Sequence, residues 1–458
     1  MQQEIRGNPL HAPRLGASRK LAIGGGDFGL NFYWQTAGLY LLYFYTDVMR
    51  LPPAVGGAIY MAALIWDALL DPLIGLLADR TRSRFGRYRP WILFGAPVLG
   101  LASILLFVVP TSLGWWTVLL VGATHFLFRT LYACVSVPYA ALTARVTRDA
   151  AARADITGVR IVAATMAGLI VAMLTLPLAA AFGGGRAGWS CVGASYAAVA
   201  TVVLILCARG VGPLDSTAGD ERQPAVPLTD KLRSTASNWP LMLVLGAVAT
   251  SSFTSTIFQK SLLYYFKYAL GNASLGGAAL GFCAVVSGVC VPAFALLARR
   301  HGKRVTWMTA AVPTITGLVA WHLADGHGTV ALFAALGTIS VGSAGYYVSF
   351  WAMLPDTVEF GEWKTGARAE SFAFGLAMLG QKAALGLGAG LLGILLAQIG
   401  YRADMAQTAA TLAGLKTMMF WLPLTGAIVA APLIAFYPIS PRHHREIVRE
   451  IGRRQAIA

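Results

Sequence analysis

Two carboxylates in the middle of an apolar run constrain this chain more than any other feature of its sequence. The segment 55–91 reads VGGAIYMAALIWDALLDPLIGLLADRTRSRFGRYRPW, and it places Asp67 and Asp71 inside an otherwise apolar stretch that ends at an arginine-rich loop. Because about 20 helical residues cross the hydrocarbon core of a bilayer, both carboxylates are predicted to lie near its middle. Charged groups at that depth are rare and usually mark a path for ions or protons.

The spacing of the two aspartates places them on one face of a helix. Four residues correspond to about 40° beyond a full turn and about 6 Å of rise, so the carboxylates are neighbours. Two like charges this close in a low dielectric cannot both stay ionised without a cation or a shared proton. Pro72 has no N–H group, so it leaves the carbonyl of Ala68 without a helical partner. We expect a site for Na⁺ or H⁺ here; the alternative is that each acid pairs with a base on another helix.

Apolar runs of similar length recur along the whole chain. Of its 458 residues, 57% are hydrophobic and 12% are charged, a composition that excludes an ordinary soluble protein. We predict twelve spans, at 21–45, 54–78, 90–110, 114–140, 158–182, 188–208, 240–266, 275–298, 304–323, 328–354, 371–399 and 412–437. The sequence therefore predicts an all-α, multi-pass protein that lies in the lipid bilayer of the cell's inner (cytoplasmic) membrane.

The basic residues of the chain follow this predicted topology. A formal net charge of +16 would suit a nucleic-acid-binding protein, but Lys and Arg gather on every second connection between spans, and the intervening connections are nearly neutral. The basic segments are 80–89, 144–160, 209–238, 298–304, 362–370 and 441–454. By the positive-inside rule, both termini are predicted to lie in the cytoplasm, and no nucleic-acid partner is expected.

The longest polar stretch divides the chain into two similar halves. The linker 209–238 separates six predicted spans at 21–208 from six at 239–437, with a cytoplasmic tail at 1–20 and a basic tail at 438–458. The second spans of both halves end alike, in GLLADRTRSRFGRYRPW and ALLARRHGKRVTW. Two six-helix bundles joined in this way resemble the fold of major facilitator transporters, which bind substrate between the halves near the middle of the bilayer.

The first and fourth spans carry further polar residues that are candidates for substrate binding. Asp27 and Asn31 share one face of the first span, where Asp27 either faces water at the membrane edge or lines a cavity. In the fourth span, Arg129, Tyr132 and Ser136 follow one helical stripe. A buried arginine needs a partner. We favour an ion pair between Arg129 and an aspartate of the second span, which we call a charge lock. The alternative is that Arg129 binds a carboxylate or phosphate of the substrate.

Later spans add four more candidates and one arginine at a boundary. Arg160 opens the fifth span, where it either reaches the interface or faces the cavity. Tyr347 and Trp351 lie at helical spacing in the tenth span, and such faces either stack on sugar rings or pack in the core. Gln381 and Lys382 lie in the middle of the eleventh span, where a lysine requires a carboxylate partner or a substrate.

Several motifs together resemble one family of transporters. They are LYLLYFYTDV, IWDALLDPLIGLLADRTRSRFGRYRPWIL, VPYAAL and LPDTVEFGEWKTGARAESFAFG. They are similar to those of the glycoside–pentoside–hexuronide:cation symporters, the melibiose-permease-like branch of the major facilitators. The similarity extends from Lys20 to about Pro438. It implies symport of a sugar or glycoside with Na⁺, Li⁺ or H⁺, with Asp67 and Asp71 holding the cation, also as metal ligands if the ion is Na⁺. It also implies that Arg160 and Lys382 belong to the central cavity.

The chain departs from the family pattern at several positions. Tyr347 stands where a melibiose-type protein has a substrate-contacting tryptophan, and Asn31 and Ser136 stand where it has sugar-binding aspartates. Leu70 and Ala133 occupy positions that hold an asparagine and a threonine beside the cation. The loss of neutral oxygens favours H⁺ over Na⁺, which needs several oxygen ligands. The two sugar-binding acids are replaced by Asn31 and Ser136, and Arg129 is an additional cation relative to the family pattern. Together these changes favour an anionic substrate, such as a uronide, over melibiose.

These observations predict a secondary active transporter. We expect cation-coupled symport of a sugar, glycoside or uronide by alternating access, with a lysolipid or other amphiphile as the alternative solute. The sequence has no H-E-x-x-H or G-x-S-x-G motif, and its five cysteines lack metal-ligand spacing, so no enzyme activity and no cofactor beyond the coupling ion are expected. A sensor that binds without transporting is a further alternative. We expect the chain to work as a monomer.

Overall fold

The computed structural model describes residues 16–110, 114–146, 150–212, 215, 234–235, 237–324, 328–366 and 368–457. Most of the predicted tail at 1–20 and of the predicted linker at 209–238 lies outside these residues. Within them the chain is helical apart from loops and one isolated β-bridge, between Ser83 and Gly86. The prediction of an all-α protein is confirmed.

The helices before the linker are α1 (Ala17–Gln35), η1 (Thr36–Tyr40), α2 (Leu41–Tyr43), η2 (Phe44–Val48), α3 (Pro53–Arg80), α4 (Arg89–Val108), α5 (Trp115–Arg145), α6 (Ala150–Ala181) and α7 (Gly185–Val211). Those after it are α9 (Trp239–Tyr268), α10 (Ala273–His301), α11 (Lys303–Leu323), α12 (Thr329–Thr365), α13 (Glu370–Gln398), α14 (Ala409–Ala435) and α15 (Pro441–Ile457).

Among the described residues, ten helices are long and apolar enough to cross a membrane. These are α3 to α7, α9, α10 and α12 to α14. The first and ninth predicted spans form helices too, as the segment from α1 to η2 and as α11, but they are not among those ten. The number twelve and the cytoplasmic side of the termini therefore stay predictions.

Local sequence signals explain where several helices begin and end. Pro53 occupies the first turn of α3, where a missing N–H group costs nothing. The side chain of Asn238 caps α9 by accepting a hydrogen bond from the Leu241 N–H at 3.2 Å, and Thr408 caps α14 in the same way. α12 ends at Thr365 and is followed by Gly366, whose φ of 75° is the left-handed conformation that commonly terminates a helix.

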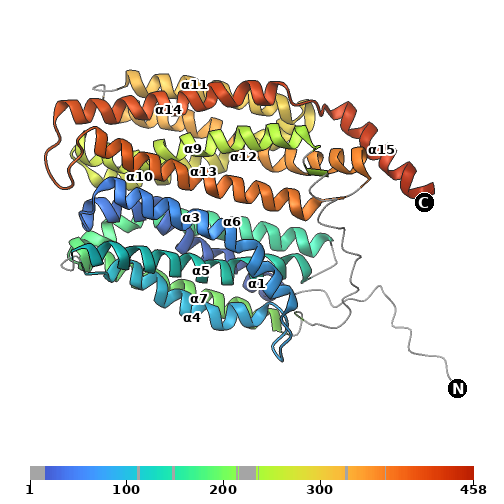
Figure 1. The fold of residues 1–458 in the computed structure, drawn as a ribbon, viewed down its shortest axis with the longest axis horizontal. Coiled ribbons are helices and arrows are strands. Elements are labelled where there is room, and N and C mark those ends of the chain that lie inside the picture. Colours follow the sequence, from blue (N-terminus) through green and yellow to red (C-terminus); the bar gives the residue numbers. More distant parts are fainter. Residues whose placement is uncertain are drawn as a thin grey trace.

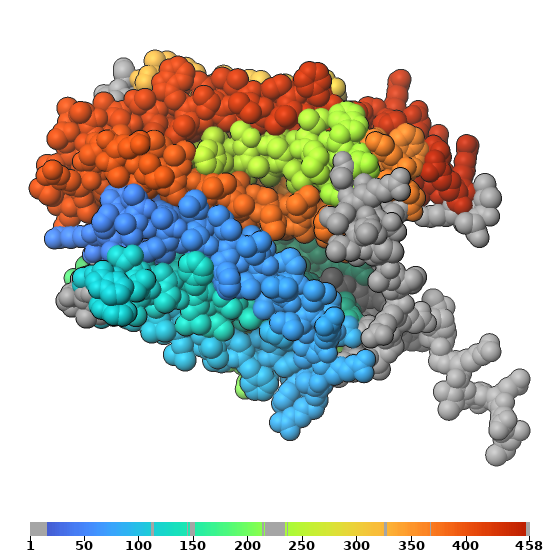
Figure 2. Space-filling model, in the orientation of Figure 1, coloured from blue at the N-terminus to red at the C-terminus, as the bar shows by residue number. Residues whose placement is uncertain are grey.

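The helices form two groups that lie side by side (Figure 1). In that view α1 to α7 make the lower group and α9 to α14 make the upper group, and α15 lies at the right end. Near the left end α3 and α13 are in close contact, because a Cβ on Gly393 would lie 2.3 Å from the Pro53 carbonyl oxygen and 2.9 Å from Gly57 Cα. Toward the right end the two helices diverge (Figures 1 and 2). We call the left end, where α3 and α13 are in contact, the closed end, and we call the right end the α15 end.

The first transmembrane-length segment contains two π-helical stretches, η1 and η2, within an otherwise α-helical rod. Such stretches are rare and often occur at functional sites. Two side chains from other helices bind the carbonyls of η1: Tyr60 OH donates to Ala37 O at 3.2 Å, and Lys260 Nζ donates to Gly38 O. Because Lys260 belongs to the upper group, this contact joins the two groups.

Candidate functional site

One lysine bridges the two aspartates of α3. Lys382 Nζ, on α13 of the upper group, lies 3.0 Å from Asp67 Oδ2 and 2.5 Å from Asp71 Oδ2. The Asp67 side chain is completely buried, and that of Asp71 is 24% exposed. The predicted charge lock therefore exists, but its base is Lys382 rather than Arg129. It joins the two groups of helices across the middle of the molecule.

The bridge leaves one oxygen of each carboxylate without a donor. Oδ1 of Asp67 and Oδ1 of Asp71 accept no hydrogen bond from the residues that the structure describes, whereas Oδ2 of Asp67 is in ion-pair contact with the Lys382 ammonium. Buried carboxylate oxygens are costly to leave unpaired. Two hard anionic ligands of this kind fit a proton or a small alkali cation better than a soft metal. The residues present therefore fit a monovalent cation beside Lys382.

Arg129 makes its contacts elsewhere. It is 1% exposed, and its Nε donates to Nε2 of His125 at 3.3 Å. Its guanidinium lies 5.3 Å from the ring centroid of Trp34 and 5.8 Å from that of Tyr60. Tyr132, one turn along the same helix, has its ring centroid 5.7 Å from that of Trp34. Arg129 is thus held mainly by aromatic faces.

Asp27 and Arg160 neutralise each other within the lower group. Arg160 Nε donates to Asp27 Oδ2, and its Nη1 donates to Thr143 Oγ1 at 2.9 Å. Asn31 Nδ2 donates to the backbone carbonyl of Asp27 at 2.9 Å. Ser136 is half-buried on α5. Three predicted substrate residues therefore form a structural cluster between α1 and α6.

A cavity of about 410 Å³ lies between the two groups. Its lining comes mostly from α9 to α14, with Gln35, Leu39, Gly168 and Ala172 from the lower group. Of the predicted substrate residues, Tyr347 and Gln381 line it. Trp351, Asp27, Asn31, Arg129, Tyr132, Ser136, Arg160 and Lys382 are not among its lining residues. Lys382 directly follows Gln381, so the ion-pair site adjoins the cavity along α13.

The lining is neutral and rich in amides, hydroxyls and aromatic rings. No charged side chain of the described residues contributes to it. Ser251, Ser255 and Gln259 follow one stripe of α9, and Gln35 and Gln381 come from α1 and α13. Such a lining suits a molecule with many hydroxyl groups and apolar ring faces.

The stripe on α9 was not among the residues predicted from the sequence. Its signal is present in the run TSSFTSTIFQ, which repeats polar residues four apart inside an apolar span. Lys260 was missed too, because it lies near the predicted boundary of that span. In the structure it is 6% exposed, and its Nζ lies 4.1 Å from the ring centroid of Tyr60.

A buried carboxylate ties the two groups together at the closed end. Asp47, on η2, accepts hydrogen bonds from Lys267 Nζ at 2.9 Å and from the hydroxyls of Tyr268 and Tyr401 at 2.6 Å. These three donors belong to α9 and to the loop after α13. The closed end is therefore held by charged and polar contacts as well as by the glycines of α3 and α13.

A second ion pair lies at the rim of the closed end. Arg50 Nη2 and Asp404 Oδ2 are 2.9 Å apart, and both side chains are exposed. Lys267 Nζ also lies 3.6 Å from Asp404 Oδ1, which connects the rim to Asp47. Exposed ion pairs contribute little stability, so we regard the buried Asp47 contacts as the main polar contacts that hold the two groups of helices together at the closed end.

Comparisons with known proteins agree with this architecture. The family described as MFS/sugar transport protein matches residues 22–441. The protein named as the uncharacterized symporter YnaJ, of Bacillus subtilis (strain 168), is 30% identical over 97% of this chain and 96% of its own length. The isoprimeverose transporter of Lactiplantibacillus pentosus is 27% identical over 98% of this chain and 95% of its own length. The solved structure of the nucleoside transporter NupG aligns with a TM-score of 0.69 at 13% identity, covering 92% of this chain and 100% of that chain, which shows a shared fold.

Proposed function

This chain belongs to the MFS/sugar transport protein family, and from that premise we propose that it carries a sugar or glycoside across the inner membrane together with H⁺ or Na⁺. It is a multi-pass membrane transporter and not an enzyme. The observation that carries the proposal of coupling is the single ammonium of Lys382 shared by Asp67 and Asp71.

The charges of these three groups explain how an ion could drive the cycle. Two carboxylates and one ammonium in ion-pair contact carry a net charge of −1, and a low-dielectric site disfavours closing around a net charge. One bound cation makes the site neutral. The bound cation also competes with Lys382 for the two carboxylates. It weakens the bridge between α3 and α13 in one state of the protein and not in the other, so its affinity for the two states differs. That differential affinity is the physical basis of coupling.

The cavity supports a neutral solute in preference to the uronide. Its lining offers amide and hydroxyl groups together with aromatic faces, and Gln381 places the solute beside Lys382. A carboxylate of the solute would enter this neutral lining without a charged partner from the lining residues, which disfavours its desolvation. Because the ion pair and the cavity are completed within one chain, we propose that a monomer is the working unit.

We further propose that the two groups are the two six-helix halves of twelve spans, with both termini in the cytoplasm. The arginine-rich segment 80–89 and the basic helix α15 both lie at the α15 end, which the positive-inside rule assigns to the cytoplasm. The closed end then faces outside, and the structure corresponds to the inward-facing state of an alternating-access cycle.

Uptake by proteoliposomes tests the proposed function. Purified protein is reconstituted and supplied with isoprimeverose, xylose, glucose or glucuronate, with an inward gradient of H⁺, of Na⁺ or of neither ion. We expect accumulation of a neutral sugar above its outside concentration only with one of the gradients, and we expect Asp71→Asn to abolish it. Equal uptake with and without gradients would contradict coupling, and accumulation of glucuronate alone would contradict the neutral solute.

A further inference from the structure

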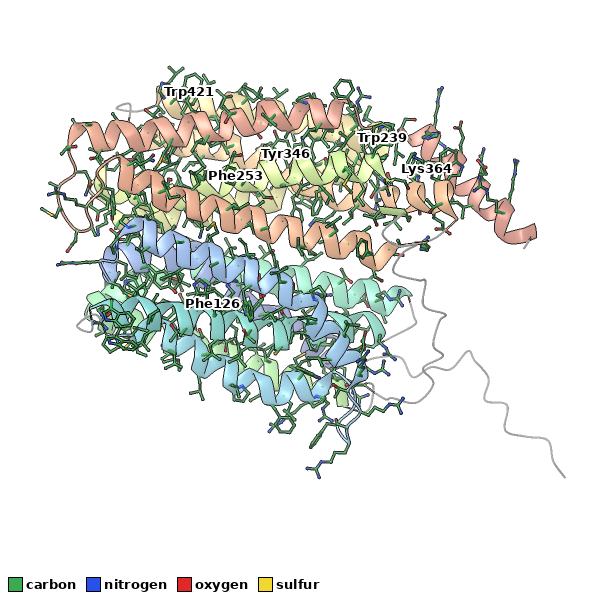
Figure 3. The ribbon with its side chains drawn as sticks, viewed as in Figure 1. Phe126, Trp239, Phe253, Tyr346, Lys364 and Trp421 are labelled. Carbon is green, nitrogen blue, oxygen red and sulfur yellow. The ribbon has the colours of Figure 1, made fainter. Side chains whose placement is uncertain are left out.

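Two carboxylates and a histidine meet where α15 packs on α12. Asp356 and Glu359 are neighbours at i and i+3 on α12, and His444 comes from the first turn of α15. His444 Nε2 lies 2.5 Å from Glu359 Oε2 and 3.3 Å from Asp356 Oδ1. Figure 3 labels Lys364 on the last turn of α12, at the α15 end of the molecule. We call Asp356, Glu359 and His444 the α12–α15 cluster.

The three side chains offer the ligand atoms that a divalent transition metal prefers. One oxygen from each carboxylate and one ring nitrogen all lie within 4.8 Å of one another. Zn²⁺ binds such atoms at about 2.0–2.2 Å, so its ligand atoms lie roughly 3–3.5 Å apart. Asp356 and His444 already have this spacing, and the Glu359 side chain is 27% exposed and free to adjust. Because Mg²⁺ and Ca²⁺ prefer oxygen ligands, the histidine favours Zn²⁺.

The charges of the cluster attract a cation. Asp356 is 4% exposed, and Lys303 Nζ of α11 lies 2.5 Å from each of its oxygens. Lys303 is the one lysine or arginine in ion-pair contact with the cluster in the described part of the chain. With His444 in the neutral form that binds metals, two carboxylates and one ammonium leave a net charge of −1. The Lys303 side chain is 27% exposed, so it is able to move aside for an ion.

A buried hydroxyl near the cluster has no hydrogen-bond partner. Tyr437 is 1% exposed, and its OH group makes no hydrogen bond within the described residues. The charges of Asp356 and Glu359 both act on this hydroxyl. An unpaired buried donor costs free energy, and carboxylates that bind a metal are commonly held by donors outside the coordination sphere. Tyr437 is therefore available as a donor to a metal-bound carboxylate.

We propose that the α12–α15 cluster binds one Zn²⁺ or a similar divalent transition-metal ion. Asp356, Glu359 and His444 supply three ligands, and water completes the coordination sphere. Because His444 belongs to α15 and both carboxylates belong to α12, the ion holds the C-terminal helix against the upper group. Lys303 competes with the ion for Asp356. This inference does not depend on the solute or on the coupling ion.

Metal binding by the purified full-length protein tests the site. The protein carries no histidine tag and is first dialysed against a chelator. Isothermal titration with Zn²⁺ or Mg²⁺ measures affinity, and hydrogen exchange follows the backbone of α15. We expect Zn²⁺ to bind about tenfold or more tightly than Mg²⁺ and to slow exchange in α15. His444→Ala removes a ligand, so it should weaken Zn²⁺ binding about tenfold or more and abolish the slowing.

Two further variants make the test specific. His443→Ala is the matched control, because the ring of this adjacent histidine packs on Trp363, with centroids 5.9 Å apart, and its Nδ1 faces Glu446 of α15. It should leave Zn²⁺ binding unchanged. Lys303→Met removes the competing ammonium and should tighten Zn²⁺ binding, the opposite of losing a ligand.

Three outcomes would overturn the site. They are a parent protein that does not bind Zn²⁺, a His443→Ala variant that loses as much affinity as His444→Ala, and a Zn²⁺ complex in which α15 exchanges as fast as without the ion. Each would leave the proposed transport function untouched, since no step of that function uses the cluster.

Discussion

Lys260 donates a hydrogen bond from α9 to the backbone carbonyl of Gly38, so an upper-group side chain binds the π-helical segment η1 of the lower group. Tyr60 of α3 binds the neighbouring carbonyl of Ala37 and also lies beneath the Lys260 ammonium. Beyond η1, the same helical rod leads to Asp47 at the closed end. The contact between Lys260 and Gly38 therefore lies on the same helical rod as the Asp47 contacts of the closed end.

Replacing Lys260 should favour opening of the closed end. Lys260→Met removes a hydrogen bond from a charged donor, worth about 1.5–3 kcal/mol, that exists only while the two groups are in contact here. We expect the population open to the outside to rise roughly tenfold or more. The measurement is alkylation of Ala389→Cys, a fully buried position at the α3–α13 contact, by a membrane-impermeant thiol reagent.

Lys260→Arg is the control for that experiment, since it keeps a positive charge and donors at the same position. Its alkylation should remain closer to that of the unmodified protein than alkylation of the methionine variant. Slower alkylation in Lys260→Met than in the parent would contradict the assigned role.

Removing either carboxylate of the ion-pair site should separate transport from the ion gradient. In Asp71→Asn and Asp67→Asn the remaining aspartate is already neutralised by Lys382, so a further cation has little to bind. We expect accumulation against a gradient to disappear, while exchange of labelled for unlabelled sugar across the membrane continues. Loss of exchange together with accumulation would indicate a damaged cavity instead of lost coupling.

A methyl group on Gly393 should push α3 and α13 apart. The new Cβ would lie 2.3 Å from the Pro53 carbonyl oxygen, a backbone atom that cannot move alone. We expect Gly393→Ala to lower stability by roughly 1–3 kcal/mol and to increase labelling from outside. Gly380→Ala on the same helix is the matched control, because its Cβ would meet no atom within 4 Å. Thermal unfolding in detergent compares the two variants, and equal losses would refute the steric explanation.

Acid should release α15 from the end of α12. Hydrogen bonds from Trp363 and Arg454 lower the pKa of the exposed Glu450 below its ordinary value of 4.5. A lowered pKa in the docked state means that the stabilisation is complete above pH 4.5 and is lost as the pH falls through the lowered value. We expect backbone hydrogen exchange of α15 to accelerate over that range in the parent. Glu450→Gln should show much less change, and an unchanged pH profile would contradict the assignment.

The sequence predicts the helices well, and it predicts that the two buried aspartates need a partner, because both predictions depend on local properties. Apolar runs of about 20 residues predict spans, and an acid inside such a run requires a partner wherever the fold supplies it. Which base becomes that partner depends on packing: Lys382 and Asp71 are 311 residues apart, whereas Arg129, on the helix beside α3, pairs with His125. Helix neighbours are set by the tertiary fold, which periodicity does not encode.

The cavity lining shows the same limit. Tyr347 and Gln381 were predicted from their depth and chemistry, and both line the cavity. Asp27 and Arg160 have equally suggestive chemistry, but they satisfy each other across α1 and α6. A side chain lines a cavity only if no neighbour pairs with it first, and the sequence does not show neighbours.

The neutral lining of the cavity has a consequence for energetics. If the solute is neutral and crosses together with one cation, as proposed, the cation alone carries the net charge that moves with each solute molecule. Each 100 mV then contributes about 2.3 kcal/mol to every turnover, enough to concentrate the solute about fiftyfold even where the cation is equally abundant on both sides. Transport by this chain would be electrogenic, and a cell could power it by voltage alone.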